Sequence, residues 1–239
     1  MNHVVILSLY RLFLSPLAWI IIALSQLITA YFFLGHLDHY LSVQDQLSTL
    51  SNPPGVGELI STPFYKDTAL ILLLLIPVIS QYLLTEEKYT GSLLFLLSAP
   101  LTSAEIILGK YLASLIFCCC LLACLSIMPL SLSHGTKIDY FTLLTGLLGL
   151  VLLCTTATAI ALYCSSLTQH PAIATIISLT VLLLLWHINW NQQSSLLSWL
   201  SMHDHTTRLL QGHLHTQDIA YYAIHSMLFI LLTIRRLAL

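Results

Sequence analysis

The chain has 239 residues, of which 57% are hydrophobic and only 8% are charged. Soluble domains average about 25% charged residues, so this composition excludes an ordinary soluble domain. A formal net charge of −2 gives no electrostatic reason to expect nucleic acid as a partner. Apolar runs of about twenty residues, the length that crosses a bilayer core, recur along the whole chain. We therefore predict one all-α domain over residues 1–239, a polytopic integral membrane protein surrounded by lipid.

The first segment, HVVILSLYRLFLSPLAWI, is apolar with a single arginine and a Ser15-Pro16 interruption. A residue that precedes proline disfavours the helical region, so a bend is expected at Ser15. We predict a short elbow helix in the inner membrane interface, followed by the first span. The alternative is that the first span simply extends toward the N-terminus. The apolar run over 12–34 is longer than the core of a signal peptide, which indicates an uncleaved span.

Six transmembrane helices account for the apolar runs. Pro77 falls inside the second and is expected to kink it. The stretch 189–217, after the fifth, is expected to contain a helix lying on the outer leaflet. The six spans are predicted at 16–35, 68–84, 106–130, 141–164, 172–188 and 219–234.

Lysine and arginine residues between the spans predict the orientation. With the N-terminus inside, the basic residues Arg11, Lys88, Lys110, Arg235 and Arg236 face inward, and Lys66, Lys137 and Arg208 face outward. Cytoplasmic loops are enriched in basic residues, so this bias places both termini in the cytoplasm. We expect the plasma membrane, which in a bacterium is the inner membrane.

The stretch EEKYTGSLLFLLSAPLTSAEIILGK, residues 86–110, concentrates the charge of the chain between two apolar runs. Thr90 can cap a short helix over 91–98, which Pro100 ends. The short helix is apolar although it follows three charged residues. It either sinks into the leaflet or the bundle, or it docks into a groove of a soluble partner.

The second half of the same stretch specifies a helix start. Thr102 and Glu105 stand three residues apart directly before an apolar run, which is the spacing of a capping box. The third span therefore begins with a defined N-terminus. Lys110, further along that helix, is expected to snorkel to the lipid headgroups.

These residues resemble the E-E-[KR]-x-x-G-[ST]-[LI] segment of type-2 ATP-binding-cassette (ABC-2) permeases. FLSPLAWIIIALSQLITAYFF resembles the elbow and first span of that family, and CSSLTQHPAIATIISLTVLLLLW resembles its inner loop and fifth span. The closing segment from His205 resembles the end of the family's domain. Within the family, the chain is most similar to the gliding-motility and nitrous-oxide-reductase-maturation permeases.

The resemblance implies a permease subunit of a transporter, and it favours export. Two permease chains would pair, as a homodimer or a heterodimer, and each would dock on a separate cytoplasmic ATPase subunit through a coupling helix. Phe95 and Leu96 stand where the family often has an acidic residue, so polar details of docking differ. The residues implied at or beside the contact with the ATPase are Glu86, Glu87, Thr90, Gly91 and Leu94.

The chain has no G-x-x-x-x-G-K-[ST] loop, so ATP is expected to bind the partner subunit instead. We predict that the chain is not an enzyme, has no catalytic residues and binds no cofactor. A function of another class stays open, namely a membrane anchor or assembly factor that transports nothing.

Polar residues inside or near the spans have two interpretations. Gln26 and Gln81 are candidates for lining a pathway, and interhelical hydrogen bonding is the alternative. His203-x-His205 and His213-x-His215 come closest to metal-ligand spacing, but solvated histidines are the alternative, and we predict no metal site. Small residues predict close packing of the fourth span: Gly146, Gly149, Ala157, Ala159 and Ala161.

Overall fold

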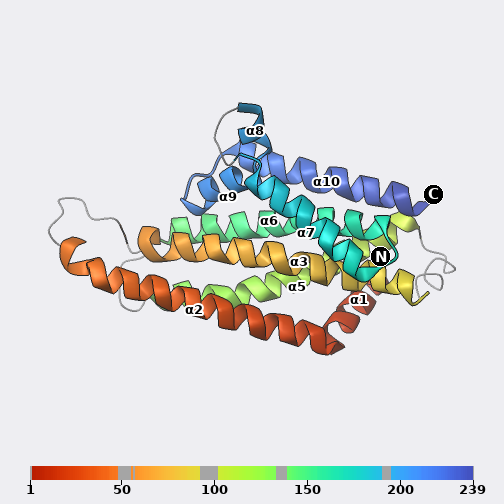
Figure 1. Cartoon of the computed structure of the whole chain (residues 1–239), viewed down its shortest axis with the longest axis horizontal. Coiled ribbons are helices and arrows are strands. Elements are labelled where there is room, and N and C mark those ends of the chain that lie inside the picture. The colour runs from red at the N-terminus through yellow and green to blue at the C-terminus, as the bar shows by residue number, and fades with distance from the viewer. Residues whose placement is uncertain are drawn as a thin grey trace.

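The computed structural model describes residues 2–47, 55, 57–91, 102–132, 139–189 and 195–238. Within these residues the regular structure is entirely helical, as the composition predicts (Figure 1). The elements are α1 (Asn2–Leu14), α2 (Pro16–Leu47), the π-helix η1 (Gly57–Ser61), α3 (Thr62–Tyr89), α5 (Ser103–Ser131), α6 (Tyr140–Leu167), α7 (Pro171–His187), α8 (Ser195–Leu200), α9 (Met202–Leu210) and α10 (Thr216–Ala238).

Among the described residues, five helices are long and apolar enough to cross a membrane. They cover Pro16–Gln44, Leu59–Tyr89, Ser103–Ser131, Tyr140–Leu167 and Thr216–Leu237. The remaining predicted span corresponds to α7, which is apolar but has only 17 residues. Spans need about 17–25 residues, so α7 stands at the lower limit, and a count of six spans stays a prediction.

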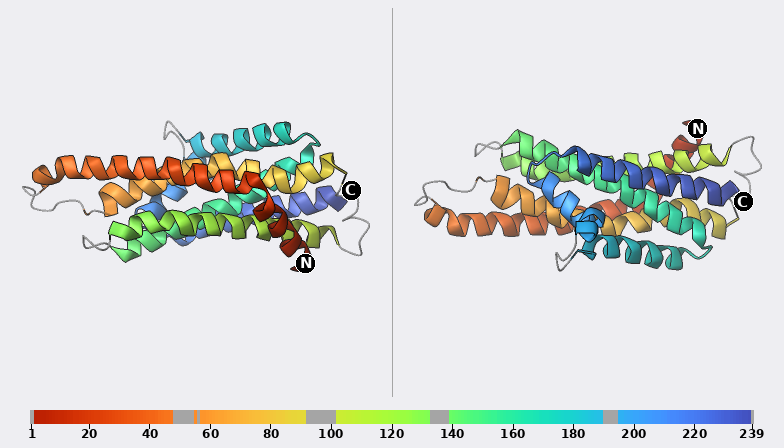
Figure 2. Two further views of the ribbon diagram at one scale, coloured as in Figure 1. Left: turned by 90° about the horizontal axis from the view of Figure 1, so that it is seen from below. Right: turned by 90° about the horizontal axis from the view of Figure 1, so that it is seen from above.

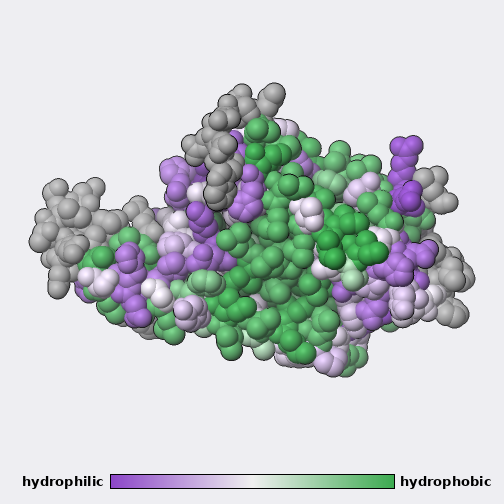
Figure 3. Space-filling model, viewed as in Figure 1, coloured by the Kyte–Doolittle hydropathy of each residue, from purple (hydrophilic) through white to green (hydrophobic). Residues whose placement is uncertain are grey.

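The long helices lie side by side along the long axis of the molecule (Figure 1). Both labelled chain ends lie at the end of the bundle where α3 finishes, which we call the Glu86 end. The opposite end, where α3 begins, we call the Lys66 end. Figure 3 shows an apolar surface over the middle of the bundle, with polar side chains gathered toward both ends. This is the surface pattern of a protein surrounded by lipid.

Helix α6 lies at the centre of the bundle and contacts α3, α5, α7, α9 and α10. Its small residues make this possible. A Cβ atom at Gly146 would lie 2.7 Å from Cδ2 of Tyr65, and one at Gly149 would lie 2.9 Å from Cβ of Leu209. Three alanines of this helix are fully buried: Ala157, Ala159 and Ala161. The predicted close packing of the fourth span is confirmed.

The Gly149→Ala substitution is expected to lower the free energy of unfolding by about 1–3 kcal/mol. The new methyl group would meet Cβ of Leu209, which cannot rotate away because it is bonded directly to the backbone of α9. Detergent-solubilised protein unfolded with increasing SDS gives the measurement. Gly35→Ala is the matched control, since a Cβ there meets nothing within 4 Å. Gly35→Ala should leave the free energy of unfolding unchanged or raise it by up to about 1 kcal/mol. Equal losses in both variants would contradict the close packing of α6 against α9.

The first two spans are longer than predicted. The prediction ended them at Gly35 and Leu84, but α2 continues to Leu47 and α3 continues to Tyr89. Hydropathy locates the apolar section of a helix and does not locate the end of the helix itself. At the end of α3 the charges are accommodated because Glu87 is ion-paired inside the bundle.

The stretch after α7 forms two helices, α8 and α9, and the predicted helix on the outer leaflet stays a prediction for α8. Helix α9 packs on the bundle and buries Met202, His205 and Leu209. Its neighbour Ser201 caps it by accepting a hydrogen bond from the Asp204 N–H, at 3.3 Å. The apolar side of α9 is directed at Gly149 of α6, which explains why it leaves the lipid surface.

Candidate functional site

The Glu86 end brings helix α1 close to the start of the charged stretch. Helix α1 ends at Leu14, and the chain bends at Ser15, whose N–H donates to the Leu12 carbonyl at 3.1 Å. The Ser15 hydroxyl oxygen then accepts a hydrogen bond from the Leu17 N–H, at 3.1 Å. Figure 2 shows α1 turning sharply away from α2, and α1 packs against α5. The bend predicted at Ser15-Pro16 is present.

Three charged side chains meet at this end, and we call them the ion triad: Arg11, Glu87 and Lys110. Glu87 is only 4% exposed. One carboxylate oxygen accepts from Nη1 of Arg11 at 2.7 Å, and the other accepts from Nζ of Lys110. The triad therefore ties α3 to α1 and to α5. Removing charges from water is costly, and here two cations around one carboxylate offset that cost.

Lys110 does not snorkel, so that expectation is wrong. Its side chain is fully buried, and Nζ donates to the Leu83 carbonyl as well as to Glu87. A carboxylate on the neighbouring helix lies within reach of the ammonium group. Pairing with it satisfies the charge inside the bundle, so the side chain has no need to extend toward headgroups.

The last turn of α3 is closed by hydrogen bonds of Thr90. The Thr90 N–H and hydroxyl both donate to the Glu86 carbonyl, each at 2.9 Å. Gly91 follows with φ of +75°, in the left-handed region where glycine avoids the steric penalty of a Cβ. Lys88 donates to the Ser166 carbonyl at 2.6 Å and so binds the free carbonyls at the end of α6.

Thr102 and Glu105 mark the start of α5. The Glu105 N–H donates to the Thr102 hydroxyl oxygen at 3.3 Å, and the Thr102 N–H donates to the Glu105 carboxylate at 3.0 Å. Both halves of a capping box are thus present, and α5 begins at Ser103. Leu94 and nearly all of the predicted coupling helix at 91–98 lie outside the described residues.

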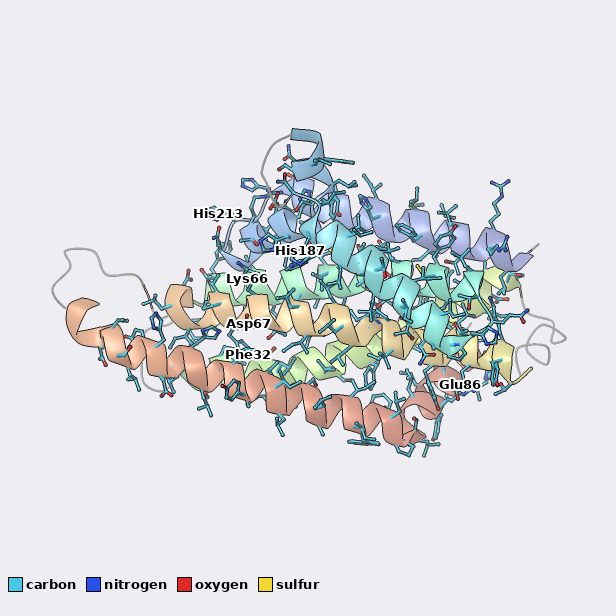
Figure 4. The ribbon with its side chains drawn as sticks, viewed as in Figure 1. Phe32, Lys66, Asp67, Glu86, His187 and His213 are labelled. Atoms are coloured by element: carbon cyan, nitrogen blue, oxygen red, sulfur yellow. The ribbon has the colours of Figure 1, made fainter. Side chains whose placement is uncertain are left out.

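Four of the five residues implied at the ATPase contact thus share one helix end, with different exposure. Thr90 is exposed and Glu86 is half-buried, whereas Glu87 faces the interior. Figure 4 places Glu86 at this end of the bundle. Sequence reasoning had not linked Arg11 and Lys110 to Glu87, although three charges in so apolar a chain were a signal to look for pairing.

Gln26 of α2 and Gln81 of α3 lie on helices that contact each other. Nε2 of Gln26 and Oε1 of Gln81 are buried, and within the described part of the chain neither has a hydrogen-bond partner. Leaving such an atom unpaired in an apolar interior is costly. These two amides differ in this respect from Thr156, whose hydroxyl donates across the bundle to the Tyr222 carbonyl at 2.9 Å.

A second buried polar cluster lies toward the Lys66 end. Asp218 is fully buried and accepts from Nε and Nη2 of Arg208, at 3.1 and 2.6 Å. Nδ1 of His205 lies 2.6 Å from the same carboxylate, and Nε2 donates to the Trp199 carbonyl at 2.9 Å. The Tyr221 ring stacks on the imidazole with 4.2 Å between centres. This cluster was not predicted, because its members come from separate helices.

The histidine spacings do not build a metal site in this structure. Over the described residues, no group of three or more His, Cys, Asp or Glu side chains is placed to hold a metal ion. Both ring nitrogens of His205 are engaged by protein groups. The rings of His213 and His215 lie nearly parallel, with centres 6.5 Å apart.

An apolar helical bundle with paired charges buried at its ends defines the class: an integral, multi-pass membrane protein. The chain belongs to the ABC-2 family of transporter proteins, since the model of the ABC-2 family transporter protein matches residues 9–235. The match runs from within α1 to near the end of α10 and so covers nearly the whole chain. No curated protein matches this chain.

Proposed function

We propose that this chain is the permease subunit that couples ATP hydrolysis by a separate ATPase subunit to substrate export. Family membership supports a transporter component. The observation that carries the coupling role is the ion triad, which includes Glu87 near the end of α3, shortly before residues 92–101 in the sequence. A docked ATPase would act on that segment.

Force applied to residues 92–101 would enter the bundle at Gly91 on one side and at Thr102 on the other. The triad ties the end of α3 to α1 and α5, so the three helices would move as one unit. In this proposal Glu86 and Thr90 contribute to the contact surface. Glu87 acts from inside, by transmitting the movement rather than by touching the ATPase.

Family membership supports a proposal for the wider assembly. We infer an orientation in the bacterial inner membrane with the Glu86 end, and with it both termini, in the cytoplasm. A second permease chain, identical or different, would complete the transporter, and lipid would surround it. The unpaired amides of Gln26 and Gln81 would line the path, where a polar solute could satisfy them. The motif over 86–110 favours the gliding-motility and nitrous-oxide-reductase-maturation subgroup.

Capture of an ATPase tests the proposal. The chain is purified in mild detergent from cells that also express the ABC-type ATPases of the same organism, as wild type and as Glu86→Arg with Thr90→Arg. Both positions reach the surface, so folding should survive. We expect wild type to retain an ATPase and the double variant to retain at least about tenfold less.

The control is Gln211→Arg with His215→Arg, two exposed positions toward the Lys66 end, which should capture as much ATPase as wild type. If wild type captures no ATPase, the coupling role is wrong. If wild type captures an ATPase, the ATPase is then inactivated by mutation. A complex that still performs its cellular function with the inactive ATPase would favour a membrane anchor.

A further inference from the structure

A cavity of about 570 Å³ opens toward the Lys66 end, between the start of α3, the end of α7 and helix α9. Figure 4 shows Lys66 and His187 near one another at this place, far from Glu86. Trp186, Asn189, His203 and Arg208 also line it. We propose that this cavity binds a phosphate-type oxyanion, presented by a free anion or by a lipid headgroup.

The cationic side chains of the cavity have donors to offer. Lys66 is exposed and, within the described part of the chain, makes no ion pair or hydrogen bond. Arg208 binds Asp218 through Nε and Nη2, which leaves the Nη1 group available. A lysine and an arginine at one cavity are the usual partners of phosphate, which accepts several charge-assisted hydrogen bonds.

A buried imidazole nitrogen points to a missing partner. Nδ1 of His203 is shielded from solvent and, among the described residues, has no hydrogen-bond partner. Its ring packs edge-on against Trp186, with 4.9 Å between centres. Such buried polar atoms are rare in folded proteins and call for a ligand or water. Protonated at Nδ1, His203 would donate to an oxyanion in the cavity.

One carboxylate also lines the cavity, and it is already engaged. Oδ2 of Asp204 accepts from Nδ2 of Asn189 at 2.7 Å. This bond fixes the amide, whose Oδ1 is buried without a partner in the described part of the chain. Asp204 therefore offsets part of the positive charge, and Asp218 already balances Arg208, so Lys66 supplies the attracting charge and Nη1 of Arg208 supplies a further donor.

The titration of His203 supplies a readout. Burial, followed by the nearby charge of Lys66 and by His187, lowers the pKa of His203 below its ordinary value, and Asp204 opposes this. The ring is therefore neutral near pH 7. A bound oxyanion stabilises the protonated ring and raises this pKa. Binding should consequently strengthen as the pH falls toward that pKa.

The test follows the fluorescence of Trp186 in the full chain carrying Trp19→Phe, Trp190→Phe and Trp199→Phe. A protonated imidazole quenches an adjacent indole, so the pH midpoint of quenching reports the pKa of His203. Inorganic phosphate is added in detergent, against chloride at equal ionic strength. In a second arm, nanodiscs of phosphatidylglycerol are compared with nanodiscs of galactosyl diacylglycerol, which has no phosphate.

We expect a saturable upward shift of the midpoint in at least one arm. A shift with inorganic phosphate assigns a free anion, and a shift only in phosphatidylglycerol assigns a lipid headgroup. In the responding arm, Lys66→Gln should weaken binding about tenfold, while Lys66→Arg restores it. Arg235→Gln, an exposed charge at the other end of the bundle, should bind as wild type does.

Three results would overturn the proposal. The first is that neither probe shifts the midpoint of quenching. The second is that Lys66→Gln binds the probe as tightly as wild type does. The third is that Arg235→Gln weakens binding as much as Lys66→Gln does. Anion binding at this cavity does not depend on ATPase coupling at the Glu86 end. Failure of one therefore leaves the other standing.

Discussion

Glu87→Gln is expected to lower the free energy of unfolding by about 3–5 kcal/mol. The amide cannot neutralise Lys110, which is fully buried and would keep an unpaired ammonium inside the bundle. Loss of the ion pair would cost less at Arg11, because its side chain is 30% exposed and can turn toward water. Unfolding of the purified chain by SDS, followed by circular dichroism, measures the loss.

The neighbouring Glu86 provides a matched control, since it has the same chemistry and is only half-buried. Glu86→Gln should change stability by no more than about 0.5 kcal/mol. Lys110→Met should cost less than Glu87→Gln, because the carboxylate keeps Arg11 as its partner. Glu87→Leu combined with Lys110→Met should recover part of the loss, since no buried charge is then left alone. Equal stability of Glu87→Gln and Glu86→Gln would show that the triad does not hold the helices together.

Asp218→Asn is expected to lower the free energy of unfolding by about 1–3 kcal/mol at the other buried cluster, less than Glu87→Gln, because the side chain of Arg208 is 36% exposed and can turn toward water. Asp218 is fully buried and is the carboxylate partner of both Arg208 and His205. The amide carries no charge, so the Arg208 guanidinium would lose its counter-ion, and one of the two accepting oxygens would be replaced by a donor. Helices α9 and α10 should then separate first, which hydrogen exchange of the α9 amides would detect.

Asp67→Asn is the matched control for Asp218→Asn. Asp67 is also a helical aspartate that pairs with a histidine, His36, at 2.7 Å, but both side chains are more than 20% exposed. Pairs of this kind contribute up to about 1 kcal/mol. If the two substitutions cost the same, burial of the Asp218 cluster is not what stabilises it.

Local chemistry made some parts of this protein predictable from sequence. The bend at Ser15-Pro16 and the cap at Thr102 and Glu105 depend on residues at most three positions apart, and such patterns can be found by inspection. The helical class followed from hydropathy alone. The ends of α2 and α3 did not, because a helix continues beyond its apolar section whenever its polar residues find partners.

Ion pairs between residues far apart in the chain could not be predicted from the sequence. Arg11 and Glu87 are 76 positions apart, and no local spacing announces that they meet. His205 stood in a pattern that suggested ligand spacing, yet its partner Asp218 lies on another helix. Each charge was visible in the sequence, but only the packing of the helices decides which charges meet. The sequence therefore indicated where charge must be neutralised without indicating by what.

The length of α2 has a consequence for how the protein meets its surroundings. Its 32 residues span about 48 Å at 1.5 Å per residue, whereas the hydrocarbon core of a bilayer is about 30 Å thick. The surplus extends beyond α3 at the Lys66 end, where Figure 1 shows α2 projecting past the rest of the bundle. The pair of His36 and Asp67 joins α2 to α3 close to this projecting section of α2, which we call the arm. A molecule approaching from that side reaches the arm before it reaches the bundle.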